Sequence, residues 1–197
     1  MPVAAIPFKS PPPFELPPYI AESLRELSLP AAIEHVERIL MDSGCADAIL
    51  SVVVDGAGCM RPGPYRAHDP HVETALKGVY DEMCDRQPAL DSETGRQDFM
   101  GQAIAAGQPL LMMGDVADGT ADPFPATMRG YLLHGEKSGN LGFMYVFPIK
   151  DESGAVHGAL ALHRWLASGP LNHDQPAITH ALILELARRA GQLAKQA

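Results

Sequence analysis

Apolar residues occupy every second position through the segment from 141 to 150. The alternating residues are Leu141, Phe143, Tyr145, Phe147 and Ile149. A period of two, carried by aromatic and β-branched side chains, predicts a β-strand with two different faces. The polar stretch Lys150–Gly154 follows, and it offers a glycine for a positive φ. The pattern therefore predicts that this strand ends in a tight turn.

A second apolar run, Ala155–Leu162, follows the turn and predicts the partner strand. One face would carry Val156, Leu160 and Leu162, and the other His157, Ala159 and Ala161. The second face is small, which leaves volume beside the sheet for a helix backbone or a ligand. The two runs thus predict a hairpin at the centre of the domain.

Apolar residues three or four positions apart predict helices elsewhere in the chain. The expected helices are Pro18–Leu27, a second from Ser28 to Met41, His71–Cys84, Asp98–Ala106, and a long final helix Asp174–Gln196. Dense apolar segments predict further strands at Ala48–Val54, near Cys59–Met60, and at Pro109–Asp115. Prolines predict a loop over Pro62–Pro70, and glycines and prolines predict another over Gly114–Gly130.

Composition limits the class of protein. The chain has 197 residues, 46% hydrophobic and 20% charged, which favours one globular domain. We divide it into a proline-rich arm (residues 1–18) and a single domain (residues 19–197). The net charge of −9 and the lack of a Lys/Arg cluster argue against nucleic-acid binding.

Membrane and redox signals are equally informative. No apolar run reaches the ~20 residues that span a bilayer, and no secretory signal is visible, so no membrane partner is expected. Cys45, Cys59 and Cys84 are odd in number and widely spaced, which disfavours structural disulfides. A reducing cytoplasm is therefore the expected location, with the cysteines as small buried apolar groups.

Several ordered motifs carry a family resemblance. Ala48–Asp55 matches a first strand with its turn, Gly101–Leu110 a "gxaixxgqpv" connector, and Asp115-Val116 a following "D-v" position. Phe147–Leu160 fits a "vPlxdxxgxvxGxl" signature, and Leu171–Asp174 fits the opening of a last helix. In this order, over roughly Pro30–Ala194, the chain resembles a GAF domain.

The resemblance implies an α+β fold. A GAF-like central antiparallel sheet of five or six strands would have the N- and C-terminal helices on one face and a ligand pocket on the other. The terminal helices usually form a homodimer interface. The resemblance therefore implies a sensory or regulatory domain that binds a small organic ligand and acts through dimer geometry.

Candidate pocket residues lie at strand ends and in the loop that would cover the pocket. They are Asp115, Arg129, Tyr131, His134, Tyr145 and His163. The planar fork of Arg129 suits a carboxylate or phosphate. No metal site, cofactor site or catalytic constellation is expected, because no complete ligand set, Ser–His–Asp order, P-loop or H-E-x-x-H is present.

Three alternatives stay open. Some GAF proteins reduce free methionine sulfoxide with cysteines in the loop before the "vPl" strand, but no cysteine lies between Gly114 and Pro148. The acyl-homoserine-lactone-binding domain of quorum-sensing regulators has a related fold, and Tyr65 and Asp69-Pro70 resemble its pocket pattern. Its pocket tryptophans are missing, since the sole tryptophan is Trp165. The third alternative is a dimerisation module with a collapsed pocket.

Overall fold

The computed structural model describes residues 5–7, 11–70, 73–74, 77–78, 89–93, 95, 99–113, 141–165 and 168–196. The named elements, in chain order, are β1 (Ala5–Pro7), α1 (Pro18–Arg25), α2 (Leu29–Asp42), β2 (Ala48–Val54), β3 (Met60–Ala67), α5 (Phe99–Ala106), β4 (Leu110–Met113), β5 (Leu141–Lys150), β6 (Val156–Trp165) and α7 (Gln175–Ala194). The helix expected over His71–Cys84 lies largely outside the described residues.

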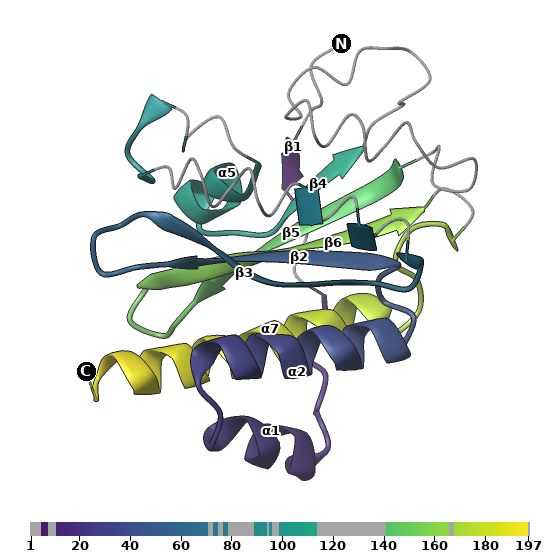
Figure 1. The fold of residues 1–197 in the computed structure, drawn as a ribbon. Helices are drawn as coiled ribbons and strands as arrows, with labels where there is room; N and C mark the ends of the chain where they lie inside the picture. Colours follow the sequence, from purple (N-terminus) through teal and green to yellow (C-terminus); the bar gives the residue numbers. More distant parts are fainter. Residues whose placement is uncertain are drawn as a thin grey trace.

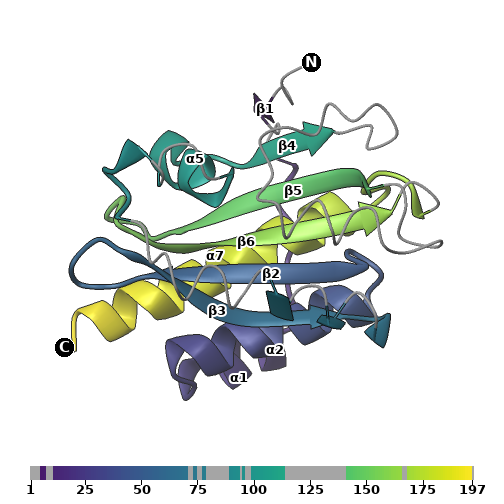
Figure 2. The ribbon, with the colours of Figure 1, turned by 45° about the horizontal axis from the view of Figure 1, so that its top comes forward.

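The described strands form one antiparallel sheet of six strands in the order β1-β4-β5-β6-β2-β3, with the expected hairpin β5–β6 near its centre. Figure 2 shows this order from above the sheet. At the hairpin turn, Gly154 has φ 88°, a conformation that glycine adopts without the steric cost of a Cβ. The α+β class and the five-or-six-strand antiparallel sheet are confirmed.

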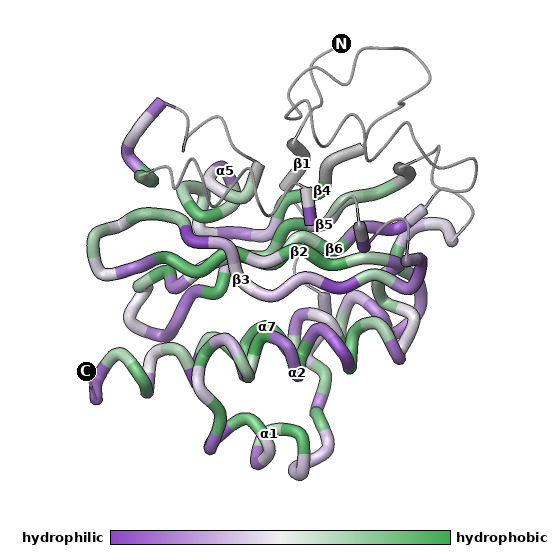
Figure 3. The backbone as a smooth tube through the Cα atoms, in the orientation of Figure 1, coloured by the Kyte–Doolittle hydropathy of each residue, from purple (hydrophilic) through white to green (hydrophobic). Residues whose placement is uncertain are grey.

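Helices α2 and α7 cover one face of the sheet, and α1 packs on their outer side (Figure 1). Hydrophobic and hydrophilic residues alternate along α2 and α7 in Figure 3, as is typical of helices that bury one face. Ile33, Val36 and Leu40 of α2 pack with Leu182 and Leu186 of α7 and with the sheet. The terminal helices therefore share one face, as expected.

The opposite face carries α5 (Figure 1). Met100, Ala103 and Ile104 of α5 pack against Val146 and Ala159, among other residues of the sheet. Gly107 ends this helix at φ 61°, the left-handed conformation typical of a residue just beyond a helix. The small side chains of Ala159 and Ala161 thus provide room for a helix over this part of the sheet.

One side-chain prediction in the hairpin is wrong. Leu160 and Leu162 face the helices and Ala159 and Ala161 face α5, as the alternation requires. Val156, however, packs on the α5 side with the alanines. The pairing shifts between Ile149 and Lys150, so one extra residue is accommodated and the alternation changes phase.

The loop predicted over Pro62–Pro70 is also wrong over its first part, because β3 continues to Ala67. β3 lies at the edge of the sheet, where a proline sacrifices no backbone hydrogen bond to a neighbouring strand. A register shift between Leu50 and Val52 accommodates this irregular sequence. Prolines in the sequence therefore marked an edge strand.

The proline-rich arm contributes to the sheet as well. Its residues Ala5–Pro7 form a short strand that pairs antiparallel with β4. The boundary between arm and domain stays a prediction. Among the described residues, none of the helices combines the length and apolar character that crossing a bilayer demands.

Candidate functional site

His163 lies on the α5 side of the sheet, near the end of β6. Its neighbours across the two adjacent strands are Met144 of β5 and Ala48 of β2, both of which belong to the apolar cluster on that face. The ring is fully buried, and this burial lowers its pKa to about 4. At neutral pH His163 is therefore a neutral imidazole, able to donate one hydrogen bond and accept another.

Tyr145 lies on the opposite face. It packs in the cluster beneath α2 and α7, and its hydroxyl oxygen accepts a hydrogen bond from the backbone N–H of Leu171 at 3.0 Å. Burial raises the pKa of this phenol. Tyr145 thus fixes the segment before α7, and the sheet separates it from His163. Asp115, Arg129, Tyr131 and His134, the other predicted pocket residues, lie outside the described residues.

Arg164 connects the strand that carries His163 to the helix layer. Its side chain is 5% exposed, and its guanidinium donates to the carbonyls of Ser168 (2.7 Å) and Gly169 (2.8 Å). It also donates to the carbonyl of Gly44, just after α2. The arginine therefore holds together the end of β6, the end of α2 and the approach to α7.

Asp47 holds the same junction between β6, α2 and α7 through hydrogen bonds to the residues around Arg164. Its carboxylate accepts hydrogen bonds from the Trp165 backbone N–H at 2.8 Å and from the Ser168 hydroxyl at 3.0 Å. The Asp47 backbone N–H donates to the carbonyl of His163 at 2.8 Å. The backbone on both sides of Arg164 is consequently held in one position.

Glu37 is a buried acid that sequence reasoning did not single out. It lies on α2 and is fully buried, and its two oxygens have no hydrogen-bond partner within the described part of the chain. The nearby Ser51 hydroxyl donates to the Pro64 carbonyl instead. Burial raises the pKa of Glu37 to about 8, against smaller opposite effects of the Ser51 hydroxyl and of Arg66. The carboxyl is thus mostly protonated at neutral pH.

We predict that His163 makes folding pH-dependent on the acid side. Unfolding raises its pKa from about 4 to the ordinary 6.5, so the unfolded chain binds the proton more readily and stability falls as pH drops through this window. Between pH 7 and pH 5, wild type should lose about 2 kcal/mol relative to His163→Gln. Urea unfolding at both pH values measures this difference; parallel pH profiles would contradict it.

Glu37 is predicted to lower the stability of the fold as the pH rises. Its pKa is raised in the folded state, so the folded chain holds a proton that the unfolded chain releases, and stability falls as pH rises from about 4.5 to about 8. Glu37→Gln keeps the shape without the ionisation, and its stabilising effect should be about 2 kcal/mol larger at pH 8 than at pH 6. Glu22→Gln, an exposed change on α1, is the control. A Glu37 variant with an unchanged pH slope would refute the assignment.

Metal-ligating groups do not assemble in the part of the chain that is described: no three His, Cys, Asp or Glu side chains come together there. Cys45 is buried beside the end of α2, and Cys59 is partly exposed at the β2–β3 turn. Cys84 lies outside the described residues. The local chemistry of the candidate site is therefore that of a neutral imidazole in an apolar setting.

Comparison with known proteins identifies the fold. No family model matches the chain, and no curated protein matches its sequence. A GAF domain/HD domain protein from Geobacter sulfurreducens superposes with a TM-score of 0.60 at 17% identity, over 86% of this chain and 96% of that one. The GAF domain of an Acinetobacter phosphoenolpyruvate-protein phosphotransferase gives a TM-score of 0.59 at 9% identity, over 91% and 93%.

An enzyme is also among the similar structures. The free methionine-R-sulfoxide reductase from Neisseria meningitidis superposes with a TM-score of 0.52 at 13% identity, over 91% of this chain and 87% of that one. Identities this low show shared architecture, and the shared architecture extends over most of each chain. The resemblance seen in the sequence motifs is thereby confirmed at the level of structure: this chain has a GAF-like fold.

Proposed function

We propose that this chain is a sensory or regulatory domain that binds a small organic ligand on the α5 face of its sheet. The proposed output is a change in the geometry of a homodimer formed through α1, α2 and α7. GAF domains among the similar structures support this kind of role. The proposal rests chiefly on the junction formed by the consecutive residues His163 and Arg164.

These two residues give a short physical route between the two faces. His163 belongs to the ligand side, and Arg164 donates hydrogen bonds to backbone at the end of α2 and before α7. The two residues are consecutive, so a shift of β6 moves both of them. Because successive side chains of a strand point to opposite faces, that shift is transmitted from one face of the sheet to the other. A ligand that contacts His163 and shifts β6 would thus also shift the hydrogen bonds between Arg164 and the helix layer.

The mechanism we propose is a population shift between two helix arrangements. A ligand changes this equilibrium only as far as it binds one arrangement more tightly than the other. Differential contact with β6 would supply that difference, and Arg164 would carry it to α2 and α7. Arg164 acts here as a positioning residue, since it faces away from the proposed ligand.

Native mass spectrometry of the purified full chain, followed by a thermal-shift screen of metabolites, tests the binding proposal. We expect a dimer and at least one ligand that raises the melting temperature, because a ligand at 100 times its Kd adds ~2.7 kcal/mol of stability. His163→Gln should lower the affinity for that ligand while leaving the fold intact. A monomer with no bound ligand, and no shift across the screen, would refute the proposal.

We further propose that the domain has no catalytic activity, and that it works in the cytoplasm. The methionine sulfoxide reductase among the similar structures makes the rival activity concrete. Incubation with free methionine-R-sulfoxide and a dithiol reductant should give no turnover, either for wild type or for Cys84→Ser. Turnover that Cys84→Ser abolishes would establish the enzyme instead.

A further inference from the structure

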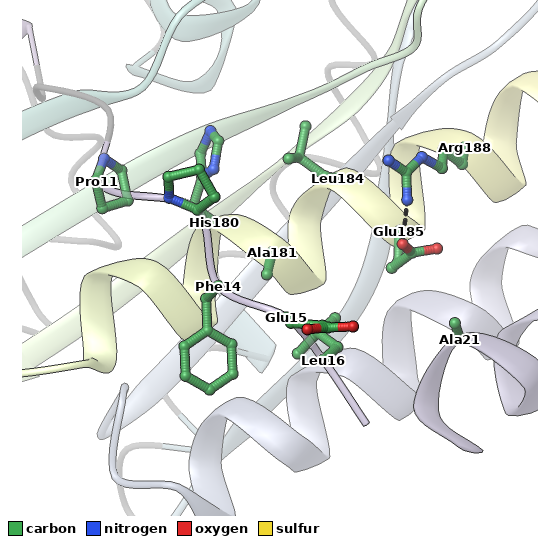
Figure 4. A pocket seen from close by; sticks show the side chains of 11 residues that line it. Pro11, Phe14, Glu15, Leu16, Ala21, His180, Ala181, Leu184, Glu185 and Arg188 are labelled. Carbon is green, nitrogen blue, oxygen red and sulfur yellow. Dashed lines mark hydrogen bonds and ion pairs between the residues drawn. The ribbon is translucent and has the colours of Figure 1, made fainter. Parts of the chain in front are cut away.

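A groove on the helix layer lies away from the α5 face. It consists of two adjoining chambers, one of about 390 Å³ and one of about 210 Å³. Both chambers are lined by Ala21 of α1 and by Glu185 and Arg188 of α7, so they form one continuous groove. The proline-rich arm, α1 and α7 together line it, as Figure 4 shows for the larger chamber.

The larger chamber is mainly apolar. Its apolar lining residues are Pro11, Pro13, Phe14, Leu16, Ala21, Ala181 and Leu184. Phe14 and Leu184 are 37% and 43% exposed, whereas most large apolar side chains of the described residues are buried or partly buried. His180 also lines this chamber, and burial lowers its pKa, so the imidazole is neutral at neutral pH. Glu15 is the one charged residue confined to this chamber.

The smaller chamber is basic, although the chain as a whole carries a net charge of −9. Three arginines and one carboxylate, Glu185, line it. Arg188 is paired with Glu185, while Arg189 donates its Nε–H to the Leu27 carbonyl at 2.7 Å. Within the described residues no ion pair reaches Arg25 or Arg189. Two guanidinium charges thus remain available to an anion.

The size of the groove favours a small molecule over a protein. Eleven residues line the larger chamber and seven the smaller, with three in common, whereas a stable protein interface uses about 20–30 residues a side. Volumes of ~300–1,000 Å³ are usual for small-molecule sites with apolar walls and a few polar groups. From Ala181 to Gln192 the groove follows α7 for ~16 Å, at 1.5 Å per residue.

We propose that this groove binds a single-chain anionic amphiphile, with its acyl chain in the apolar chamber and its carboxylate against Arg25 and Arg189. A guanidinium offers paired N–H donors that match the two oxygens of a carboxylate. The acyl chain would cover Leu184 and Phe14 and remove their apolar surface from water. The groove and His163 lie on opposite sides of the sheet, so ligand binding at His163 and binding in the groove can each fail while the other holds. The homodimer proposed above uses the same helices, so it must leave this groove uncovered.

Calorimetric titration of the full chain with sodium dodecanoate, kept below its micellar concentration, tests the proposal. We expect saturable binding of one molecule per chain. Dodecan-1-ol, which lacks the charge, and acetate, which lacks the chain, should each bind at least tenfold more weakly. Arg25→Gln should lower the affinity for dodecanoate about tenfold, the equivalent of one charge-assisted hydrogen bond. Leu184→Ser should lower the same affinity several-fold.

Arg38→Gln is the matched control, because Arg38 is an exposed arginine of α2 outside the groove. It should leave the affinity for dodecanoate unchanged. Circular dichroism of each variant checks that the fold is intact. Equal affinity for dodecanol and dodecanoate, or equal affinity in wild type, Arg25→Gln and Leu184→Ser, would overturn the proposal. So would absence of binding together with dissociation of a dimer by Leu184→Ser, since a second copy would then occupy the groove.

Discussion

Replacing Arg164 by methionine should lower the free energy of unfolding by about 4 kcal/mol, among the largest effects of any single change in the domain. Methionine fills much of the same volume but donates no hydrogen bond. Wild-type Arg164 donates to the carbonyls of Gly44, Ser168 and Gly169. Each hydrogen bond from a charged donor contributes about 1.5–3 kcal/mol, and partial access of water to the freed carbonyls reduces the total.

Urea unfolding followed by circular dichroism measures this effect from the change in midpoint at constant slope. Arg38→Met is the control: its ion pair with Glu34, at 3.8 Å and largely exposed, should contribute less than about 1 kcal/mol. Arg164→Lys should recover little, because one ammonium group cannot reach three carbonyls as the guanidinium fork does. A lysine variant as stable as wild type would show that only the charge matters at this junction.

Much of the fold followed from local patterns. The alternation in β5 and β6 and the helical spacing in α2 and α7 predicted these elements to within a few residues. Such patterns are informative because each element buries one face, and the period of burial is set by backbone geometry alone. Ser28 is the residue that directly precedes α2, although its side chain makes no capping hydrogen bond.

Features that depend on neighbouring strands could not be read in the same way. Whether Pro62 interrupts a strand depends on which side of it lacks a partner, and the local sequence does not contain that information. The change of phase at Val156 arises from a register shift against β5. Both outcomes are properties of strand pairing, so only the assembled sheet determines them.

The candidate site was predictable in part. The structure places the candidate His163 on the α5 face of the sheet, whereas Tyr145 falls on the other face, where it anchors the approach to α7. Arg164 and Glu37 could have been recognised from the sequence, because each is a charged residue at a position that the apolar pattern buries. Arg164 continues the face of Leu160 and Leu162, and Glu37 follows Ile33 by one helical turn. A charged residue at a position that the pattern buries indicates either a hydrogen-bonded junction or a perturbed pKa.

Gly158, in strand β6 of the hairpin, is the position of the second large expected effect on stability. Replacing Gly158 by valine should destabilise the fold by about 3 kcal/mol, in the upper range for inserting bulk into a packed interior. A Cβ at this position would lie 2.1 Å from the carbonyl oxygen of Val52 and 3.2 Å from the Cα of Val53. Both contacts are with the backbone of β2, which pairs with β6 on the other side of the hairpin.

Because a backbone carbonyl cannot rotate away as a side chain can, the β2–β6 pairing itself has to yield. Gly56→Ala is the matched control, since no atom lies within 4 Å of the new Cβ. Urea midpoints of the two variants measure the difference. A Gly158→Val protein with the stability of Gly56→Ala would mean that β2 and β6 lie farther apart than in this structure, and the direct connection between His163 and the helix layer would then lose its rigid support.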